Sequence, residues 1–335
     1  MKKAGMLIFV TLIMVSLLTM SACNRTSESG SESAVITLTA ASAASSANIM
    51  FQFTQETAEE VTDQSGGRLN IRLVWDGVLG GDSELIESCI DGSVPIIQLG
   101  SSPLLSYIPE IAIFDMPFVF ESKDQAYAGI AQFVDFFDEV FQRRNLKILG
   151  MGFAGFRGFS SNVNIRTPAD FNGLRIRTLE NRFHMAFWNN LGASPTPLAF
   201  PELYLALSQG LMHAQDNPIT AVQASRFYEV QDYFMSITAF PFVSFWLMNL
   251  DAYNTLSAGD RALVEDFAQR NLRESFEQSD RNEADAFRAI GNEITVLPIT
   301  NEIMAAMRTA AEPVWGMIAQ SIGSDITQAY LNTAR

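Results

Sequence analysis

Strand-like and helix-like patterns alternate along most of this chain, and this alternation restricts its possible folds more than any other feature of the sequence. Alternating apolar and polar residues indicate strands, whereas apolar residues repeating with the helical period indicate helices. Strands are predicted at 35–40, 69–75, 94–99, 146–153, 174–178 and 211–215. Helices are predicted at 48–64, 83–90, 123–144, 182–191, 202–209, 219–229 and 260–286, the last being the longest. Such alternation predicts an α/β architecture with mostly parallel sheets.

The first residues resemble a targeting segment and not a part of this fold. Lys2 and Lys3 precede an almost unbroken apolar run from 6 to 20. As a helix this run would be about 22 Å long, which is shorter than the ~30 Å hydrocarbon core of a bilayer. The run therefore fits the apolar region of a signal peptide better than a membrane-spanning helix.

The run ends in MSAC at 20–23, which resembles the bacterial lipobox, although that pattern usually begins with Leu. The resemblance implies a lipoprotein signal peptide at 1–22 and a lipid anchor on Cys23, which would become the first residue. Residues 23–33 then form a polar and flexible tether rich in Ser and Glu. The alternative is ordinary cleavage beside an unrelated cysteine.

Composition narrows the class of protein that follows the leader. Roughly 300 residues remain, which can bury a large core that we expect to be divided between two lobes. Cys89 is then the remaining cysteine, so no internal disulfide is expected, and its apolar helical context predicts a small buried hydrophobe. The net charge of −15 argues against nucleic acid as a partner. It does not exclude an anion-binding pocket, because net charge governs solubility and not the content of one site.

Two groups of short segments carry a more specific signal, because they occur in a fixed order along the chain. The segments in the second half read FNGLRIR at 171–177, LGASPTP at 191–197, PELYLALSQG at 201–210, DNP at 216–218 and FYEV at 227–230. The segments in the first half read SGGRL at 65–69, VLGGDSEL at 78–85 and DMPFVF at 115–120. In this order and spacing they resemble the signature of the DctP family, the solute-binding proteins of TRAP transporters.

The resemblance implies a two-lobed fold like that of periplasmic binding proteins, with hinge crossovers between the lobes and a long bracing helix. We expect lobe I to comprise 34–154 plus 243–282, and lobe II to comprise 155–242 plus 283–335. Family members capture small carboxylates, such as C4-dicarboxylates, keto acids and sugar acids, and deliver them to a membrane permease. The chain is accordingly expected outside the cytoplasm, as a monomer without cofactor, with an organic acid and TRAP permease subunits as partners.

Arg177 is the main candidate for binding the ligand. Leu174 and Ile176 share one face of the predicted strand and Arg177 lies on the other, near the carboxyl end, where open α/β sheets place ligands. A guanidinium group binds a carboxylate through two parallel hydrogen bonds, and Arg177 matches the carboxylate-binding arginine of the family. Arg157 matches a second family arginine, for which ligand contact, direct or through water, and a structural role in the hinge both stay open.

Two further residues match positions that contact ligand in the family. Asn217 precedes Pro218, which suits the first turn of a helix, so Asn217 is predicted to be the N-cap of that helix. Helix N-termini attract anions, which makes this capping role compatible with ligand contact. Phe200 matches an aromatic position that packs over the ligand, and packing in the core is its alternative.

Several other residues are expected near the cleft. Trp246 is a candidate to cover the site, with core packing as its alternative. Ser45, Asp82 and Ser101 lie where loops of the first lobe should face the cleft, as do the neighbouring Ser46 and Ser102. Their side chains are predicted to exchange hydrogen bonds with the ligand.

One departure from the family pattern concerns the segment before the DNP element. The family usually has Asp-Gly where this chain has His213 and Ala214. The change could alter lobe packing or ligand choice, so the particular acid is not identified by the sequence. For His213 itself a structural role is expected in preference to titration near neutral pH.

Two alternatives belong to other classes of function. An enzyme is disfavoured, because His184 and His213 are accompanied by no nucleophile motif, no metal-spaced cluster and no phosphate-binding glycine loop with its Lys-Ser/Thr pair. A sensor of the same fold would present its bound ligand to a membrane receptor kinase. Its binding chemistry would be the same, so the sequence leaves this alternative open.

Overall fold

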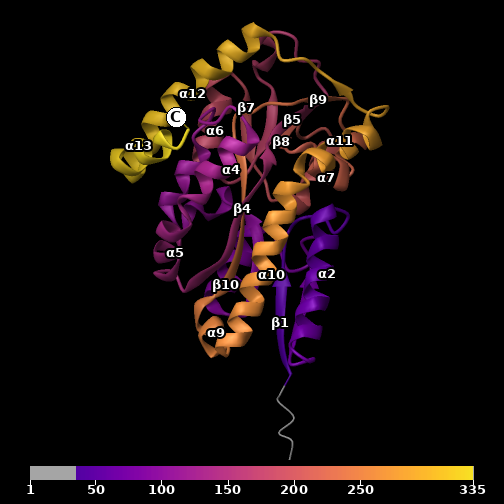
Figure 1. Cartoon of the computed structure of the whole chain (residues 1–335). Helices are drawn as coiled ribbons and strands as arrows, with labels where there is room; N and C mark the ends of the chain where they lie inside the picture. The colour runs from indigo at the N-terminus through magenta and orange to yellow at the C-terminus, as the bar shows by residue number, and fades with distance from the viewer. Residues whose placement is uncertain (1–34, 335) are drawn as a thin grey trace, which may run out of the picture. The chain divides into compact units, whose positions relative to one another are not determined.

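The computed structural model describes residues 35–334. The predicted signal peptide at 1–22, the anchor residue Cys23 and the tether at 23–33 lie outside the described residues. Two β-sheets organise the described part of the chain. The strands of the first sheet occupy the lower half of Figure 1 and those of the second sheet the upper half.

The first sheet has the strand order β2-β1-β3-β10-β4. Its strands are β1 (Ile36–Ala41), β2 (Leu69–Val74), β3 (Ile96–Gly100), β4 (Leu146–Phe156) and β10 (Pro241–Asn249). β1 pairs in parallel with β2 and β3, whereas β10 runs antiparallel between β3 and β4. The apolar sequence of β10 is buried along nearly its whole length, as expected for an inner strand covered on both faces.

The second sheet has the strand order β11-β9-β5-β8-β6-β7. Its strands are β5 (Gly158–Ser161), β6 (Arg175–Thr178), β7 (Ser194–Pro197), β8 (Ala214–Asn217), β9 (Tyr233–Met235) and β11 (Thr295–Val296). β6 pairs in parallel with β7 and β8, while β5 runs antiparallel to β8 and β9. Both sheets are therefore mixed, each with an antiparallel strand next to a parallel group.

Helices connect the strands and cover the sheets. Those before β5 are α2 (Ile49–Gln64), α3 (Asp82–Asp91), α4 (Lys123–Ala131) and α5 (Val134–Gln142). Those between β6 and β9 are α6 (Arg182–Asn190), α7 (Leu203–Ser208) and α8 (Ile219–Ala224). The C-terminal helices are α9 (Leu250–Thr255), α10 (Ala258–Glu277), α11 (Ser279–Ile290), α12 (Asn301–Ile322) and α13 (Ser324–Asn332). Side-chain caps fix several starts: for example, the Asn48 side chain accepts from the Met50 N–H at the start of α2.

The chain passes directly from one sheet to the other at two neighbouring places, and a third passage, from β10 to β11, runs through the helices α9, α10 and α11. β4 ends at Phe156 and β5 begins at Gly158, so Arg157 alone separates a strand of the first sheet from one of the second. The chain returns between the end of β9 and Pro241, where β10 begins. At the first crossing the Arg157 N–H donates to the Phe240 carbonyl at 3.0 Å, which ties the two crossings together.

The α/β fold class predicted from the sequence is confirmed, with corrections to particular elements. The predicted helix at 123–144 is two helices, α4 and α5, and the predicted helix at 260–286 is divided between α10 and α11. The longest helix of the described chain is instead α12. Cys89 is buried in α3, as predicted, and burial raises the pKa of its thiol.

The α10 helix packs closely on β4 because two glycines leave room for it. A Cβ atom on Gly152 would lie 2.9 Å from the Cβ atom of Leu272 on α10. We expect Gly152→Ala to lower the free energy of unfolding by about 1 to 3 kcal/mol, since the helix would have to move outward. The matched change Gly316→Ala in α12 meets no atom within 4 Å and should raise stability by about 0.5 to 1 kcal/mol. Chemical denaturation of both variants would test this pair, and equal effects would contradict it.

The C-terminal helices contact two helices that follow strands of different sheets. α12 packs against α6 and against the short 3-10 helix η2 (Pro109–Asp115), and α13 also packs against η2. The Tyr330 ring of α13 lies edge-on to Phe114 with the ring centres 5.7 Å apart. The part of the fold around the first sheet is called the first half below, and the part around the second sheet the second half. These contacts connect the end of the chain to both halves. The lobe boundaries expected from the sequence stay a prediction.

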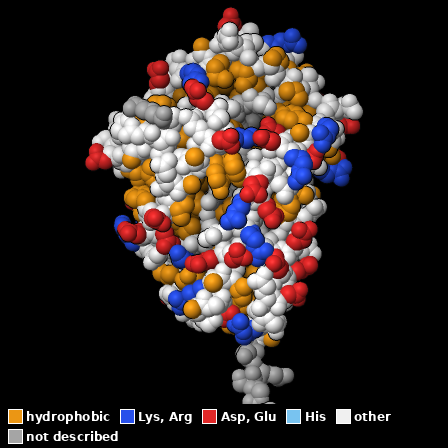
Figure 2. All heavy atoms as spheres, viewed as in Figure 1, with side chains coloured by type: hydrophobic (Ala, Val, Ile, Leu, Met, Phe, Trp, Pro, Cys, Tyr) orange, Lys and Arg blue, Asp and Glu red, His pale blue; other side chains and the backbone are white. Residues whose placement is uncertain are grey.

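The surface carries charges of both signs. On the face shown in Figure 2, acidic and basic side chains are interspersed, and apolar side chains are exposed between them. The net charge of −15 therefore produces no field of a single sign on this face. Within residues 35–334, no helix combines the length and the apolar character needed to cross a membrane.

Candidate functional site

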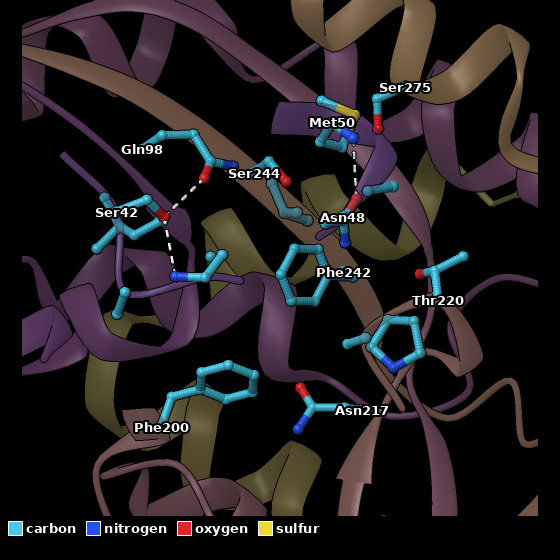
Figure 3. A pocket seen from close by; sticks show the side chains of 18 of the residues that line it. Ser42, Asn48, Met50, Gln98, Phe200, Asn217, Thr220, Phe242, Ser244 and Ser275 are labelled. Carbon is cyan, nitrogen blue, oxygen red and sulfur yellow. Dashed lines mark hydrogen bonds between the residues drawn. The ribbon is translucent and has the colours of Figure 1, made fainter. Parts of the chain in front are cut away.

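A cavity of about 150 Å³ lies beside the crossings, between loops that follow strands of the two sheets. Asn48 and Gln98 line it from the side of the first sheet, and Phe200 and Asn217 line it from the side of the second. Figure 3 shows these two groups facing each other, with the ring of Phe242 between them. The cavity is therefore placed where a movement of one half against the other would open or close it.

Arg177 lies on β6 and is fully buried, behind the residues that line the cavity and not among them. Its guanidinium carbon is 5.9 Å from the centre of the Phe200 ring, which lines the cavity. The Nε atom donates to the Leu198 carbonyl at 2.8 Å, but Nη1 and Nη2 have no hydrogen-bond partner among the described residues. Burial lowers the pKa of Arg177 to about 10, although the charge of Asp216 opposes this shift. Two unpartnered N–H groups on a buried cation are suited to an anion with two oxygens.

The neighbouring Arg175 shows how different the environment of Arg177 is. The two arginines are two positions apart on β6 and so share one face, yet Arg175 is exposed and donates to the Leu211 and Gly210 carbonyls. Arg175 therefore holds the backbone segment before β8 through hydrogen bonds to its carbonyl groups. Of these two arginines, only Arg177 has buried guanidinium nitrogens without a partner among the described residues.

Arg157 lines the cavity from the first crossing and is 3 % exposed. Its Nη2 atom donates to the Asp216 carbonyl and to Asn217 Oδ1, the latter at 3.1 Å, and lies 3.3 Å from Asp216 Oδ1. The prediction that Asn217 is an N-cap is wrong, because Pro218 precedes α8 without a side-chain cap. Asn217 instead ends β8, and its Nδ2 donates to Gln215 Oε1 at 2.7 Å. Arg157 and Asn217 thus hold each other at the wall of the cavity.

A buried imidazole connects Arg157 to the opposite wall. The ring nitrogens of His184 lie 3.0 Å from Asp115 Oδ1 and 3.3 Å from Asp216 Oδ2. Asp115 also accepts from the Ser102 hydroxyl at 2.8 Å. Ser102 and Arg157 line the cavity, whereas the three residues between them lie in the interior. The result is a continuous polar chain from η2 of the first half to β8 of the second.

The charged side chains along this polar chain of hydrogen bonds stabilise one another. Burial alone would lower the pKa of His184, but its hydrogen bonds to Asp115 and Asp216 outweigh burial and raise it. Burial alone would raise the pKa of Asp216, but the Arg157 charge and the bond from His184 outweigh it and lower that pKa to about 2. Asp216 is consequently ionised throughout the physiological range of pH.

Of the tryptophans, Trp75 and not Trp246 faces the cavity. Trp246 is fully buried on β10, where its ring lies edge-on to Phe267 of α10 with the centres 4.8 Å apart. Core packing, the alternative given for Trp246, is the role that the structure shows, and the covering role is not. Phe200 does line the cavity, and its ring also lies edge-on to Phe227 at 5.8 Å.

The predicted polar residues of the first half divide into two groups. Asp82 and Ser101 line the cavity, as does Ser102. Ser45 does not line it, and its hydroxyl donates to the Ala224 carbonyl at 3.2 Å. Ser46 does not line it either, and its hydroxyl donates to Asp76 at 2.5 Å.

Direct contacts join the two halves around the cavity. A Cβ atom on Gly77 would lie 2.5 Å from Pro201 Cγ, and the φ of +65° at Gly77 also favours glycine. The Ser83 hydroxyl donates to Glu180 at 3.2 Å, and the bond from Ser45 to Ala224 adds a third contact. Since Arg177 is fully buried, these contacts describe a closed arrangement.

His213 lies outside the cavity lining. Its backbone N–H donates to the Arg175 carbonyl at 2.8 Å, and its carbonyl accepts from the Asn162 N–H. Burial lowers the pKa of its imidazole, and the charge of Arg175 lowers it further. Ala214 follows in β8 and is buried.

Sequence reasoning missed several residues of this site. It used His184 only to argue against catalysis, and it gave no role to Asp115, Asp216, Gln98 or Phe242. No local signal identifies His184 and its carboxylates as a group, because they lie 69 and 32 positions apart. No group of three or more His, Cys, Asp and Glu within residues 35–334 is arranged to hold a metal ion.

The family model for bacterial extracellular solute-binding proteins, family 7 (DctP), matches residues 40–321, which is more than half of the chain. The chain belongs to the DctP family. This confirms the family predicted from the short segments of the sequence. A solute-binding protein of Verminephrobacter eiseniae is 29% identical over 232 residues, covering 68% of each chain.

Two further proteins are similar to this DctP-family chain. The 2,3-diketo-L-gulonate-binding periplasmic protein YiaO of Escherichia coli is 30% identical over 178 residues, or 52% of this chain and 54% of YiaO. The sugar acid binding protein DctPAm of Advenella mimigardefordensis, solved in complex with galactonate, superposes with a TM-score of 0.84. It is 24% identical, with 90% of this chain and 98% of DctPAm covered, and so establishes the shared fold.

Proposed function

We propose that this protein is the extracytoplasmic receptor of a TRAP transporter, which captures a small organic acid and delivers it to the membrane permease. The unpartnered Nη1 and Nη2 atoms of Arg177 carry the proposal. Buried guanidinium nitrogens without hydrogen-bond partners are unfavourable. A ligand carboxylate would relieve that cost by accepting both hydrogen bonds.

The names of the relatives support a carboxylate as the ligand. YiaO is named for a keto sugar acid, and the DctPAm structure holds galactonate. The sialic acid-binding protein SiaP of Vibrio cholerae, 27% identical over 223 residues, is named for another sugar acid. These compounds share a carboxylate and differ in the rest of the molecule. The carboxylate is what we extend to this chain, with Arg177 as its partner.

The proposed mechanism is closure of two lobes around the ligand. A ligand can reach Arg177 only when the first half moves away, because Arg177 is fully buried in the closed arrangement. The contacts of Gly77 with Pro201 and of Ser83 with Glu180 would break on opening and form again on closure. A ligand that binds the closed state more tightly shifts the population toward it. The permease would then recognise the closed receptor with its ligand bound.

The N-terminal residues supply the proposed location. A signal peptide at 1–22 would direct export, a lipid on Cys23 would hold the protein at the outer face of the membrane, and 23–33 would act as a tether. Two anchoring signals are usually needed for stable membrane attachment, and bacterial lipoprotein cysteines carry more than one acyl chain. Release of a Cys23→Ser variant from the membrane fraction would support this location, and unchanged attachment would contradict it.

Thermal denaturation with a panel of small organic acids and neutral sugars tests the proposed function. A ligand that binds only the native state adds about 2.7 kcal/mol of stability at a hundred times its Kd. We expect an acid to raise the Tm and its neutral sugar counterpart to leave it unchanged. A shift with neutral compounds alone would contradict the role given to Arg177.

A further inference from the structure

The charged side chains around the cavity constrain what kind of acid fits. Among the described residues that line it, the charged ones are Asp82 and Arg157. Lysine and histidine are absent from this lining. The other polar lining groups are neutral amides and hydroxyls. A ligand therefore binds in a site with few cations, and for each cation the structure shows which anion it is paired with.

Most of the positive charge near the cavity is already balanced. Arg157 is paired with Asp216, and His184 lies between Asp216 and Asp115. Arg177 is the buried cation whose Nη1 and Nη2 atoms have no protein partner among the described residues. One carboxylate can accept from both atoms. A second carboxylate on the same ligand could reach only Arg157, whose Nε atom also has no partner among the described residues but whose charge is already paired with Asp216.

Asp82 makes a second carboxylate more unfavourable still. It is the first residue of α3 and lines the cavity. Burial raises the pKa of its carboxyl to about 6, against the opposing charges of Arg177 and Arg157. At neutral pH the group is mostly ionised, and no side chain or backbone group donates a hydrogen bond to it among the described contacts. An ionised carboxylate accepts hydrogen bonds and repels a second anion.

The remaining lining groups suit hydroxyl groups on the ligand. Gln98 Oε1 accepts from Ser42 at 3.1 Å and Asn48 Oδ1 accepts from the Met50 N–H at 2.9 Å. The amide nitrogens of Gln98 and Asn48 have no partner among the described residues, and Figure 3 shows both side chains at the cavity. A hydroxyl group can accept from such amides and can donate to Asp82. The rings of Phe200 and Phe242 offer apolar surface to the carbon chain between the hydroxyls.

We propose that the ligand is a hydroxylated monocarboxylate, whose carboxylate pairs with Arg177 and one of whose hydroxyls donates to Asp82. Asp82 is then the residue that rejects dicarboxylates. This inference rests on the proposed function, because it assumes that Arg177 holds a carboxylate. An ammonium group at Asp82 is disfavoured, since it would lie near the guanidinium charges of Arg177 and Arg157 that act on Asp82.

Matched pairs of acids test the inference by isothermal titration at neutral pH with the purified protein. Gluconate, galactonate and threonate carry one carboxylate, whereas glucarate, galactarate and tartrate carry a second one in place of the terminal alcohol. We expect at least one monocarboxylate to bind about tenfold or more tightly than its paired dicarboxylate, because like charges in a partly buried site repel. Glucosaminate, which has an ammonium group at the second carbon, should bind more weakly than gluconate if gluconate binds.

The variant Asp82→Asn isolates the residue. It keeps the shape of the side chain and removes its charge, so the preference for the monocarboxylate should fall by about tenfold. Asp91→Asn removes the same charge from the exposed end of α3 and should leave the preference unchanged. Unchanged Tm values would show that both variants are folded.

The outcomes separate this inference from the function on which it rests. If a dicarboxylate binds wild type as tightly as its partner or more tightly, the inference is wrong and the receptor function stands. If Asp82→Asn leaves the preference of wild type unchanged, Asp82 is not the selecting residue and the proposal fails. If no acid of either series binds, this inference falls, while the broader panel of acids decides the receptor function separately.

Discussion

Replacing Arg177 with glutamine is expected to weaken binding of the cognate acid by about a hundredfold to a thousandfold. The ligand carboxylate would lose the two charge-assisted hydrogen bonds that Nη1 and Nη2 are placed to donate. It would also remain buried in the closed protein beside Asp82 and Asp216 with one cation fewer. Isothermal titration with the acid that gives the largest thermal shift would measure the loss.

The same variant should stay folded, which separates binding from stability. The unliganded protein buries the Arg177 charge without a partner for Nη1 and Nη2, so removing that charge relieves a desolvation cost. The loss of the bond from Nε to the Leu198 carbonyl acts in the opposite direction by about 1 kcal/mol. We therefore expect the Tm without ligand to be equal to that of wild type or higher.

Arg175→Gln is the matched control for this experiment. It removes the same charge from the same strand, but Arg175 is exposed and directed to the Gly210 and Leu211 carbonyls. Its affinity for the acid should stay within about twofold of wild type, because an exposed charge is screened by solvent. Equal affinity of Arg177→Gln and wild type would refute the role of Arg177. It would also refute the proposal that the ligand is a carboxylic acid.

Local sequence signals predicted the elements that local interactions determine. The helix expected at 48–64 forms as α2, with Asn48 as its cap and with Gly66 and Gly67 beyond its end. The helix expected at 123–144 breaks instead near Phe133. The Phe133 ring there packs edge-on against Tyr330 of α13, with the centres 5.6 Å apart. A contact between residues so distant in sequence leaves no trace in the periodicity of either segment.

Strands covered on both faces were the least predictable elements. β10 is apolar throughout and shows no alternation, so the sequence pattern gave neither the strand nor the direction of its side chains. The sequence therefore left open whether Trp246 covers the site or packs in the core, and its side chain packs against Phe267 of α10. Trp75, at the end of the alternating strand β2, is the tryptophan that lines the cavity.

The candidate site was predictable in part, and the division has a physical reason. Arg177 and Asn217 belong to segments that resemble the family, Arg157 and Phe200 match single family positions, and the structure brings the four together. The polar chain through Asp115, His184 and Asp216 depends on the approach of three distant segments. A lone histidine in a sequence does not reveal its partners, and only the fold shows that this one lies between two carboxylates.

Breaking this polar chain at Asp216 should give the largest loss of stability. Asp216 is fully buried and is the carboxylate shared by Arg157 and His184, with the charge of Arg177 also close enough to lower its pKa. Asp216→Asn leaves these cations without their common anion, so the free energy of unfolding should fall by about 3 to 5 kcal/mol. Asp232→Asn, at an exposed position, is the control and should change stability by less than about 0.5 kcal/mol. Chemical denaturation of both variants would measure the difference.

The pH dependence of this loss identifies electrostatics as its cause. The folded protein holds the pKa of Asp216 at about 2, below its ordinary value of 3.8, so the stability it contributes is present above about 4 and is lost as the pH falls toward 2. His184 has a raised pKa, so its contribution is present below its ordinary value of 6.5 and is lost as the pH rises through the raised value. The stability gap between wild type and Asp216→Asn should therefore be widest between these limits and should narrow in acid. A gap that stays constant from neutral pH down to about 2 would mean that the loss comes from packing, because packing does not depend on protonation.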